Sequence, residues 1–201
     1  IDLLIESNSI ISSKLAASSY RDSKLAASGE SSKLAASGYS SQLAASGYNS
    51  KLAASGYSSK LAASGEFSKL AASGNYSQLA ASGESSQLAA SGESSKLAAS
   101  GNYSQLAASG YNSQLAASGY NSQLASSGNS SQLAASGEFS IAICAGLNGI
   151  ASAGENGCIA LTWWDDTKSS YRIEVGYIGE NGIKPNTPYR LNDEHKFEEA
   201  I

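Results

Sequence analysis

Residues 86–103 read Ser-Gln-Leu-Ala-Ala-Ser-Gly-Glu-Ser-Ser-Lys-Leu-Ala-Ala-Ser-Gly-Asn-Tyr, two copies of one nine-residue phrase. The phrase Ser-Lys/Gln-Leu-Ala-Ala-Ser-Gly-x-x recurs from Ser23 to Ser140, and its leucines fall nine residues apart from Leu25 to Leu133. A fixed short period is the signature of a repeat architecture, in which each unit buries its apolar face against the next. The period therefore decides the fold class before any other residue is considered.

The phrase favours β-strands over helices. Nine is a poor multiple of the helical period, and the glycine in every phrase would cost a helix roughly 1 kcal/mol. In a strand, positions one, three and five (Ser, Leu, Ala) face one way, and positions two, four and six (Lys/Gln, Ala, Ser) face the other. Leucine marks the first set as the interior, and the glycine at position seven leads a turn.

One strand and one turn only reverse the chain, so two phrases are needed to close a coil. We predict an all-β fold, a β-solenoid in the form of a flattened β-roll with two nine-residue repeats per 18-residue coil, about seven coils and a small C-terminal β cap. Residues 1–22 are expected to form an N-terminal cap and a first irregular repeat. Residues 23–148 form the solenoid, and residues 149–201 a degenerate last coil and a β-meander cap that covers its edge.

The repeat has one irregularity at its start. Leu15 precedes Leu25 by ten residues, which predicts a bulge or wider turn at Ser19-Tyr20-Arg21-Asp22.

After the last full phrase the frame is expected to persist, with Ser140, Gly149 and Cys158 at position one. Cys144 then falls on inward position five and Cys158 on inward position one. Buried free thiols are expected rather than a zinc pair, which would lack two further ligands, while a disulfide stays open.

The charge balance and the small number of potentially reactive side chains argue against several functions. Residues 23–140 carry six lysines and five glutamates, so the rod is nearly neutral and has no strong nucleic-acid signature. The only histidine, His195, lies in a charged tail and is expected to be solvated rather than catalytic. Calcium sites of nonapeptide rolls need an aspartate in each repeat, and the repeat region has only Asp22. We expect no enzyme activity, catalytic residue, metal site or cofactor.

Targeting signals are equally sparse. The chain has no run of eighteen apolar residues and no basic segment typical of a signal peptide at its start, so no membrane association is expected. It opens on Ile1 rather than on methionine, which leaves open whether residues precede it.

Aromatic residues at the two variable turn positions are the best binding candidates. With eighteen residues per coil, one edge collects Tyr39, Tyr57, Tyr76 and Tyr111, and the other Tyr48, Tyr103 and Tyr120, with Phe67 and Phe139 at the same positions. They are either decoration that stacks between coils or a recognition edge. Trp163 and Trp164 point to opposite faces of a strand, so one is expected under the cap and the other as an exposed contact.

The phrases Gly-Tyr-Asn-Ser-Gln-Leu-Ala-Ala-Ser, Ser-Ile-Ala-Ile-Cys-Ala-Gly and Gly-Cys-Ile-Ala-Leu-Thr-Trp-Trp, with a terminal Ile-Lys-Pro-Asn-Thr-Pro-Tyr-Arg-Leu, resemble uncharacterised nonapeptide-repeat proteins of phages, prophages and gut bacteria. The resemblance covers residues 13 to about 199 and implies a mobile-element origin. It implies no catalytic residue.

The expected function is a non-enzymatic interaction protein that binds a host macromolecule, expected to be a protein, through its solenoid surface and cap, with inhibition of a host or defence protein as one version. The alternatives are a structural fibre or adhesin module and an ice-binding solenoid, the latter weakened by lysines on both faces. A homo-oligomer is expected if the cap's apolar face pairs. The protein is expected in the host cytoplasm or associated with a virion.

Overall fold

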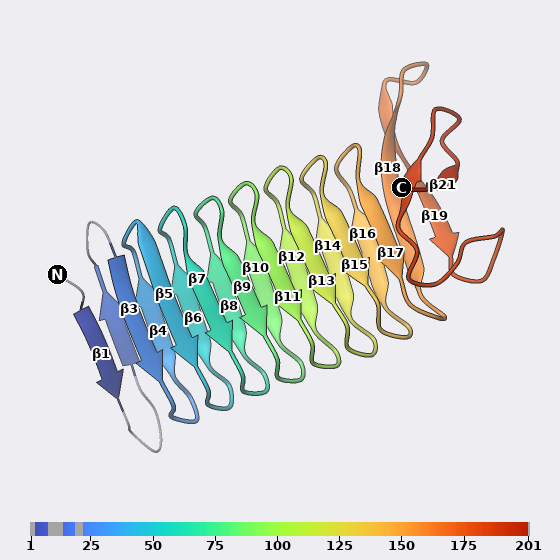
Figure 1. The fold of residues 1–201 in the computed structure, drawn as a ribbon. Helices are drawn as coiled ribbons and strands as arrows, with labels where there is room; N and C mark the ends of the chain where they lie inside the picture. The colour runs from blue at the N-terminus through green and yellow to red at the C-terminus, as the bar shows by residue number, and fades with distance from the viewer. Residues whose placement is uncertain (1–2, 8–13, 19–21, 201) are drawn as a thin grey trace.

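The computed structural model describes residues 3–7, 14–18 and 22–200, and in them the chain forms strands and turns without a helix. The strands stack as a β-solenoid, which confirms the predicted fold class (Figure 1). Two sheets form the two faces of a flattened rod. We call them sheet A, with eleven strands, and sheet B, with ten.

The strands of sheet A, in spatial order, are β1 (Leu3–Ser7), β3 (Asp22–Ala27), β5 (Ser40–Ala45), β7 (Lys60–Ala63), β9 (Gln78–Ala81), β11 (Lys96–Ala99), β13 (Gln114–Ala117), β15 (Gln132–Ala135), β17 (Ile150–Ala153), β20 (Tyr189–Leu191) and β21 (Phe197–Glu199). Those of sheet B are β2 (Lys14–Ala17), β4 (Lys33–Ala36), β6 (Lys51–Ala54), β8 (Lys69–Ala72), β10 (Gln87–Ala90), β12 (Gln105–Ala108), β14 (Gln123–Ser126), β16 (Ile141–Cys144), β18 (Cys158–Asp165) and β19 (Ser170–Tyr177). From β1 to β18 the chain alternates between the two sheets, so consecutive strands of the solenoid face each other across the core.

Parallel pairing in register confirms the eighteen-residue coil. Leu88 on β10 pairs with Leu106 on β12, eighteen residues later, and Leu97 on β11 pairs with Leu115 on β13. Near the start, Lys14 pairs with Lys33, nineteen residues later, as the predicted extra residue requires. Of the predicted bulge at Ser19-Tyr20-Arg21-Asp22, the first three residues lie outside the described part of the chain.

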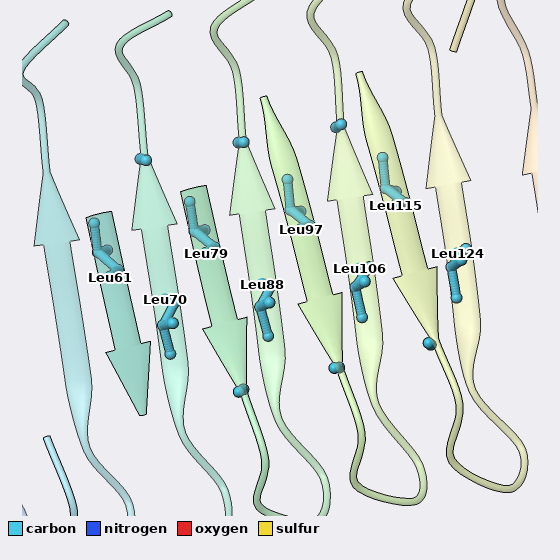
Figure 2. Packing of buried hydrophobic residues seen from close by; sticks show 14 of the residues in the cluster. Leu61, Leu70, Leu79, Leu88, Leu97, Leu106, Leu115 and Leu124 are labelled. Atoms are coloured by element: carbon cyan, nitrogen blue, oxygen red, sulfur yellow. The ribbon is translucent and has the colours of Figure 1, made fainter. Parts of the chain in front are cut away.

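The core is a double row of leucines flanked by small side chains. Leu88 and Leu97 are each 2% exposed, and Figure 2 shows the leucines of the two sheets in two parallel rows. Full burial of one leucine stabilises a fold by roughly 1.5–3 kcal/mol, and every phrase repeats that contribution. Serine at position one and alanine at position five are buried beside it, which confirms the inward set that the two-residue period predicts.

The buried serines are satisfied by the turns that precede them. Ser50 Oγ donates to the carbonyl of Gly47 at 2.7 Å, and Ser95 Oγ donates to the carbonyl of Gly92 at 2.8 Å. Within the described chain, no buried side-chain nitrogen or oxygen lacks a hydrogen-bond partner. Because an unpaired buried hydroxyl would cost about 1–3 kcal/mol, this bond makes an interior serine tolerable and fixes the turn.

The glycine at position seven is required by close approach between coils. A Cβ on Gly92 would overlap the backbone carbonyl of Gly74 in the preceding coil, and the same holds along both edges of the rod. Left-handed backbone occurs instead at position nine, where Asn49 has a φ of 56° and Phe67 a φ of 55°. The turn therefore separates two tasks, with glycine for packing and asparagine, serine or an aromatic residue for the left-handed conformation.

The predicted position of Cys158 is wrong by one residue. Cys158 pairs with Ile141, seventeen residues earlier, and therefore stands at outward position two, half-buried, while Gly157 takes inward position one. The cause is a missing residue at position six of the last phrase, where Gly154 follows Ala153 directly and begins the turn. Cys144 is fully buried as predicted, and both thiols are free.

The C-terminal segment continues both sheets. β19 pairs antiparallel with β18 at the end of sheet B, while β20 and β21 extend sheet A beyond β17 (Figure 1). Ile159, Ile183 and Tyr189 are buried between these extensions, and Phe197 packs against them. A Cβ on Gly176 would meet Ile183, Phe197 and Ile159, so this core closes tightly over the last coil.

Candidate binding surfaces

The turns form two exposed edges, and each edge carries aromatic side chains. We call the turns after sheet A strands the first aromatic edge, and those after sheet B strands the second aromatic edge. The first aromatic edge carries Tyr48, Phe67, Tyr103, Tyr120 and Phe139, and the second carries Tyr39, Tyr57, Tyr76 and Tyr111. All nine side chains are exposed, by 41–59%.

On the first aromatic edge the rings form two separate groups. Tyr48 and Phe67 lie with ring centroids 5.3 Å apart, and Tyr120 lies between Tyr103 and Phe139 at 5.9 and 5.5 Å. The intervening turn carries Glu84 and Ser85. The ring row is therefore interrupted once, by a coil that bears a carboxylate.

On the second aromatic edge three tyrosines form one row. Tyr57 stacks on Tyr39 with ring centroids 5.1 Å apart and meets Tyr76 at 5.3 Å in a tilted arrangement. Partial desolvation, together with Tyr76 and Tyr39, raises the pKa of Tyr57. Tyr111 lies beyond the next turn, and its hydroxyl receives a weak hydrogen bond from Ser130 Oγ at 3.5 Å.

Backbone bonds hold the turns in fixed register. The position-nine N–H of Phe67 donates to the carbonyl of Glu84 in the next coil at 2.9 Å, and Tyr76 donates to Glu93 in the same way at 2.8 Å. Asn75 Oδ1 accepts a further bond from the N–H of Glu93 at 3.0 Å. The aromatic rings therefore project from a rigid edge rather than from free loops.

Four aromatic residues occupy strained backbone positions. Phe67, Tyr76, Tyr103 and Phe139 all have a φ of 55–56°, a region in which bulky side chains are uncommon. Other coils place asparagine or serine there, for example Asn49 and Ser85. Backbone preference therefore does not explain the aromatic choice at these turns.

The two tryptophans lie in different environments. Trp163 is half-buried and stacks on His195 of the C-terminal segment, with ring centroids 3.6 Å apart and planes 10° apart. Its indole Nε1 donates to Glu174 Oε1 at 3.2 Å. Trp164 is 40% exposed and meets Tyr171 edge-on at 4.9 Å. The His195 ring is therefore held against the Trp163 ring, which differs from the solvated position that the sequence analysis expected.

A second surface is the apolar face that the sequence analysis expected on the cap without naming the residues that form it. The outward side chains of β19 are all apolar or aromatic and all exposed: Tyr171 by 63%, Ile173 by 59%, Val175 by 50% and Tyr177 by 56%. The apolar surface continues onto Trp164 of β18, which pairs with Tyr171, and onto Ile143 of β16, which is in register with Val175 through Ala160. Trp164 and Ile143 are each 40% exposed. We call Ile143, Trp164, Tyr171, Ile173, Val175 and Tyr177 the C-terminal apolar face.

The alternation Tyr-x-Ile-x-Val-x-Tyr from Tyr171 to Tyr177 is the sequence signal for this surface. It predicts a strand with one apolar side, but a strand pattern alone assigns that side to the core. In the structure Arg172 and Glu174 lie on the opposite side of β19, where each is half-buried. Arg172 Nε lies 3.4 Å from Asp165 Oδ2, and Glu174 Oε1 accepts a hydrogen bond from the Trp163 indole N–H.

The turn between β18 and β19 is organised by Asp165. Its Oδ1 accepts bonds from the Thr167 hydroxyl at 2.6 Å and from the N–H groups of Thr167 and Lys168 at 3.0 and 3.2 Å. The Thr167 hydroxyl foremost, with the two backbone donors and Arg172, lowers the pKa of Asp165. This carboxylate fixes the end of the hairpin that carries the C-terminal apolar face.

The thiols are not activated, because burial raises the pKa of both Cys144 and Cys158. The described residues contain no group of three or more His, Cys, Asp or Glu side chains placed to hold a metal ion. In the same part of the chain, no helix has the length and apolar character needed to cross a membrane. Comparison of the chain with protein-family models, with curated proteins and with solved structures finds no match.

Proposed function

We propose that the protein is a non-enzymatic interaction protein that binds another protein along the aromatic edges of its rod. The observation that carries this proposal is the ring spacing: five neighbouring ring pairs lie 5.1–5.9 Å apart on exposed turns. Tyrosine offers a large contact area at low entropy cost, and a ring already held between neighbours loses little further freedom on binding.

The rod supports this use because its edges are rigid. In most turns a backbone bond of 2.8–2.9 Å joins the position-nine N–H to the next coil, and the Ser58 N–H instead donates to the Tyr39 carbonyl of the preceding coil at 3.0 Å. The rings therefore keep fixed separations over several coils. Sites on rigid elements hold their geometry better than sites on free loops. A partner would meet rows of rings separated by Glu84 on one edge and by Glu93 on the other.

The partner proposed is a protein with an elongated apolar surface and hydrogen-bond donors for the carboxylates and hydroxyls. Because the repeat resembles those of phage and prophage proteins, we infer that the partner is a protein of the host cell. Under this proposal the protein acts in the host cytoplasm or on a virion, and inhibition of a host or defence protein is the version to test first.

The test compares the two edges with the sheet faces. One variant replaces the first aromatic edge (Tyr48→Ser, Phe67→Ser, Tyr103→Ser, Tyr120→Ser, Phe139→Ser), and a second replaces the second aromatic edge (Tyr39→Ser, Tyr57→Ser, Tyr76→Ser, Tyr111→Ser). A matched control carries Ala71→Ser, Ala89→Ser, Ala107→Ser and Ala125→Ser on the outward face of sheet B. A partner captured from bacterial lysate by the unaltered chain is purified, and its affinity for each variant is measured by calorimetry.

We expect at least one edge variant to lose about tenfold or more in affinity, while the control binds as the unaltered chain does. Binding that survives both edge variants would overturn the proposal. Failure of the unaltered chain to retain any partner from the hosts tested would do the same. Circular dichroism of each variant confirms that the solenoid is intact.

A further inference from the structure

We propose that the C-terminal apolar face is a self-association surface, through which two copies of the chain pair face to face about a twofold axis. This inference goes beyond the proposed function, because pairing at the end of the rod leaves the aromatic edges of both copies free. It starts from an inversion of the usual strand pattern in β19.

Edge strands usually turn apolar side chains to the core and polar ones to solvent. β19 does the reverse: Ile173 and Val175 are 59% and 50% exposed, while Arg172 and Glu174 lie on the opposite side and are half-buried. On that side of the strand Arg172 forms an ion pair with Asp165, and Glu174 accepts a hydrogen bond from the Trp163 indole. Among the residues that the structure describes, no segment covers the exposed side of this strand.

The surface is continuous over three strands. Val175 lies in register with Ala160 and, through it, with Ile143, so Ala160 is only 7% exposed between its two larger neighbours. Trp164 and Tyr171 close one end of the surface by an edge-on ring contact. From their exposed fractions, the six side chains present on the order of 600 Å² on one copy.

That area fits a dimer. Two such faces together would bury about 1,200 Å², which is the lower bound for stable, specific protein interfaces. An exposed apolar patch of about 600 Å² is also at the upper end of what single chains carry, and patches of this size are often functional.

The chemistry of the face favours a second copy as its occupant. None of its six side chains carries a charge, so pairing with its own copy leaves no buried charge unpaired. A twofold pairing of identical faces also closes after two chains and produces no filament.

The solenoid constrains how the two rods lie. Outward position two of sheet B is isoleucine at Ile141 but lysine at Lys33, Lys51 and Lys69, which pair in register across neighbouring strands. Rods that overlapped along their length would bring these lysine rows against the partner's sheet. We therefore assign an arrangement in which the rods point in opposite directions and overlap only at their C-terminal ends.

The test measures the molecular mass of the chain by sedimentation equilibrium between about 1 and 100 µM. Ile173→Asp and Val175→Asp each place a carboxylate in the centre of the face, and Ala107→Asp places one on the outward face of sheet B, outside the patch. We expect a dimer for the unaltered chain and for Ala107→Asp. Each central variant should weaken dimerisation by about a hundredfold or more, because the new charge has no partner in the interface.

Cys158 supplies a second readout that needs no substitution. It lies on the same outward side, in register with Tyr177. Its labelling rate by a maleimide should therefore rise when the unaltered protein is diluted and the dimer dissociates. A monomer at 100 µM, a labelling rate independent of concentration, or central variants that dimerise as tightly as the unaltered chain would each overturn the proposal.

Discussion

The solenoid and the cap reach a buried core by opposite means. In the solenoid every coil repeats one leucine, one alanine and one serine per strand, and its stability is a sum of identical contributions. In the cap each core side chain occurs once, as with the buried Ile183 and Tyr189 and the half-buried Phe197, which close over the last coil. Repetition gives the rod a uniform surface, whereas the cap has a distinct outer face.

The two regions also differ in how they treat exposed apolar groups. The rod spreads its aromatic side chains along two edges, separated by turns with Glu84 and Glu93. The cap concentrates them on one side of β19, next to Trp164. Substitutions in the core, in the turns and in the β18–β19 hairpin will show whether the two regions also differ in how much each side chain contributes to the free energy of unfolding.

Loss of a core leucine should have the largest effect. Leu88→Ala removes a side chain that is 2% exposed in the middle of the rod and leaves a cavity between two closely packed sheets. We expect a loss of about 2–5 kcal/mol in the free energy of unfolding, measured by guanidinium denaturation. The neighbouring substitution Ala89→Ser, on the outward side, should change it by less than about 0.5 kcal/mol. Equal effects from the two would contradict the assigned inward set.

Substitution of two glycines distinguishes the cost of a steric clash between coils from the cost of an unfavourable backbone conformation. Gly92→Ala forces a methyl group against the carbonyl of Gly74 and should cost about 1–3 kcal/mol. Gly179 in the cap has a φ of 93° and open space around it, so Gly179→Ala should cost only about 1 kcal/mol, from backbone strain. Thermal unfolding of the two variants compares them. A smaller effect at Gly92 than at Gly179 would contradict the packing role of position seven.

The hairpin end should respond to pH through Asp165. Its pKa is lowered in the folded chain, so its contribution to stability is present above the unfolded value of about 4 and is lost as the pH falls through the folded value. Asp165→Asn should therefore lower the unfolding temperature at pH 7, and the difference from the unaltered chain should shrink as the pH falls below 4. An unchanged difference across this range would show that the carboxylate charge does not hold the turn.

The aromatic rows should contribute modestly to stability. Tyr57→Ser removes a ring with two ring neighbours and should cost about 1 kcal/mol of unfolding free energy. Tyr111→Ser removes a ring that has no aromatic neighbour in the described part of the chain, so its cost should stay below about 0.5 kcal/mol. If both substitutions cost the same, ring stacking between coils is not the source of the effect.

Thiol labelling checks the register of the last coil with no expected change in stability. Cys144 is completely buried and Cys158 is half-buried at an outward position, so maleimide at low protein concentration should modify Cys158 and spare Cys144. Mass spectrometry of peptides identifies the modified residue, with guanidinium-unfolded protein as the control in which both react. Protection of both thiols would instead support the inward position for Cys158 that the unbroken frame predicts.

Much of the rod could be predicted because its signal is local and repeated. The two-residue alternation around Leu88 sets the inward side, and the nine-residue period sets the coil once two phrases are needed to close it. The allocation of tyrosines to two edges follows from the same arithmetic, and the contact between Tyr57 and Tyr76 agrees with it. The shifted register at Cys158 was also readable, because Gly154 repeats the turn glycine one residue early.

The amino-acid sequence by itself therefore determined the coil, its interior and the content of its edges, since each depends on neighbours within eighteen residues. Only the tertiary structure decided which side of β19 meets solvent, that His195 stacks on Trp163, and that both sheets extend into the cap. These features depend on unique contacts between distant segments, and an alternating strand pattern has two possible orientations. The packing of Ile159, Ile183 and Phe197 around Gly176 selects one of them.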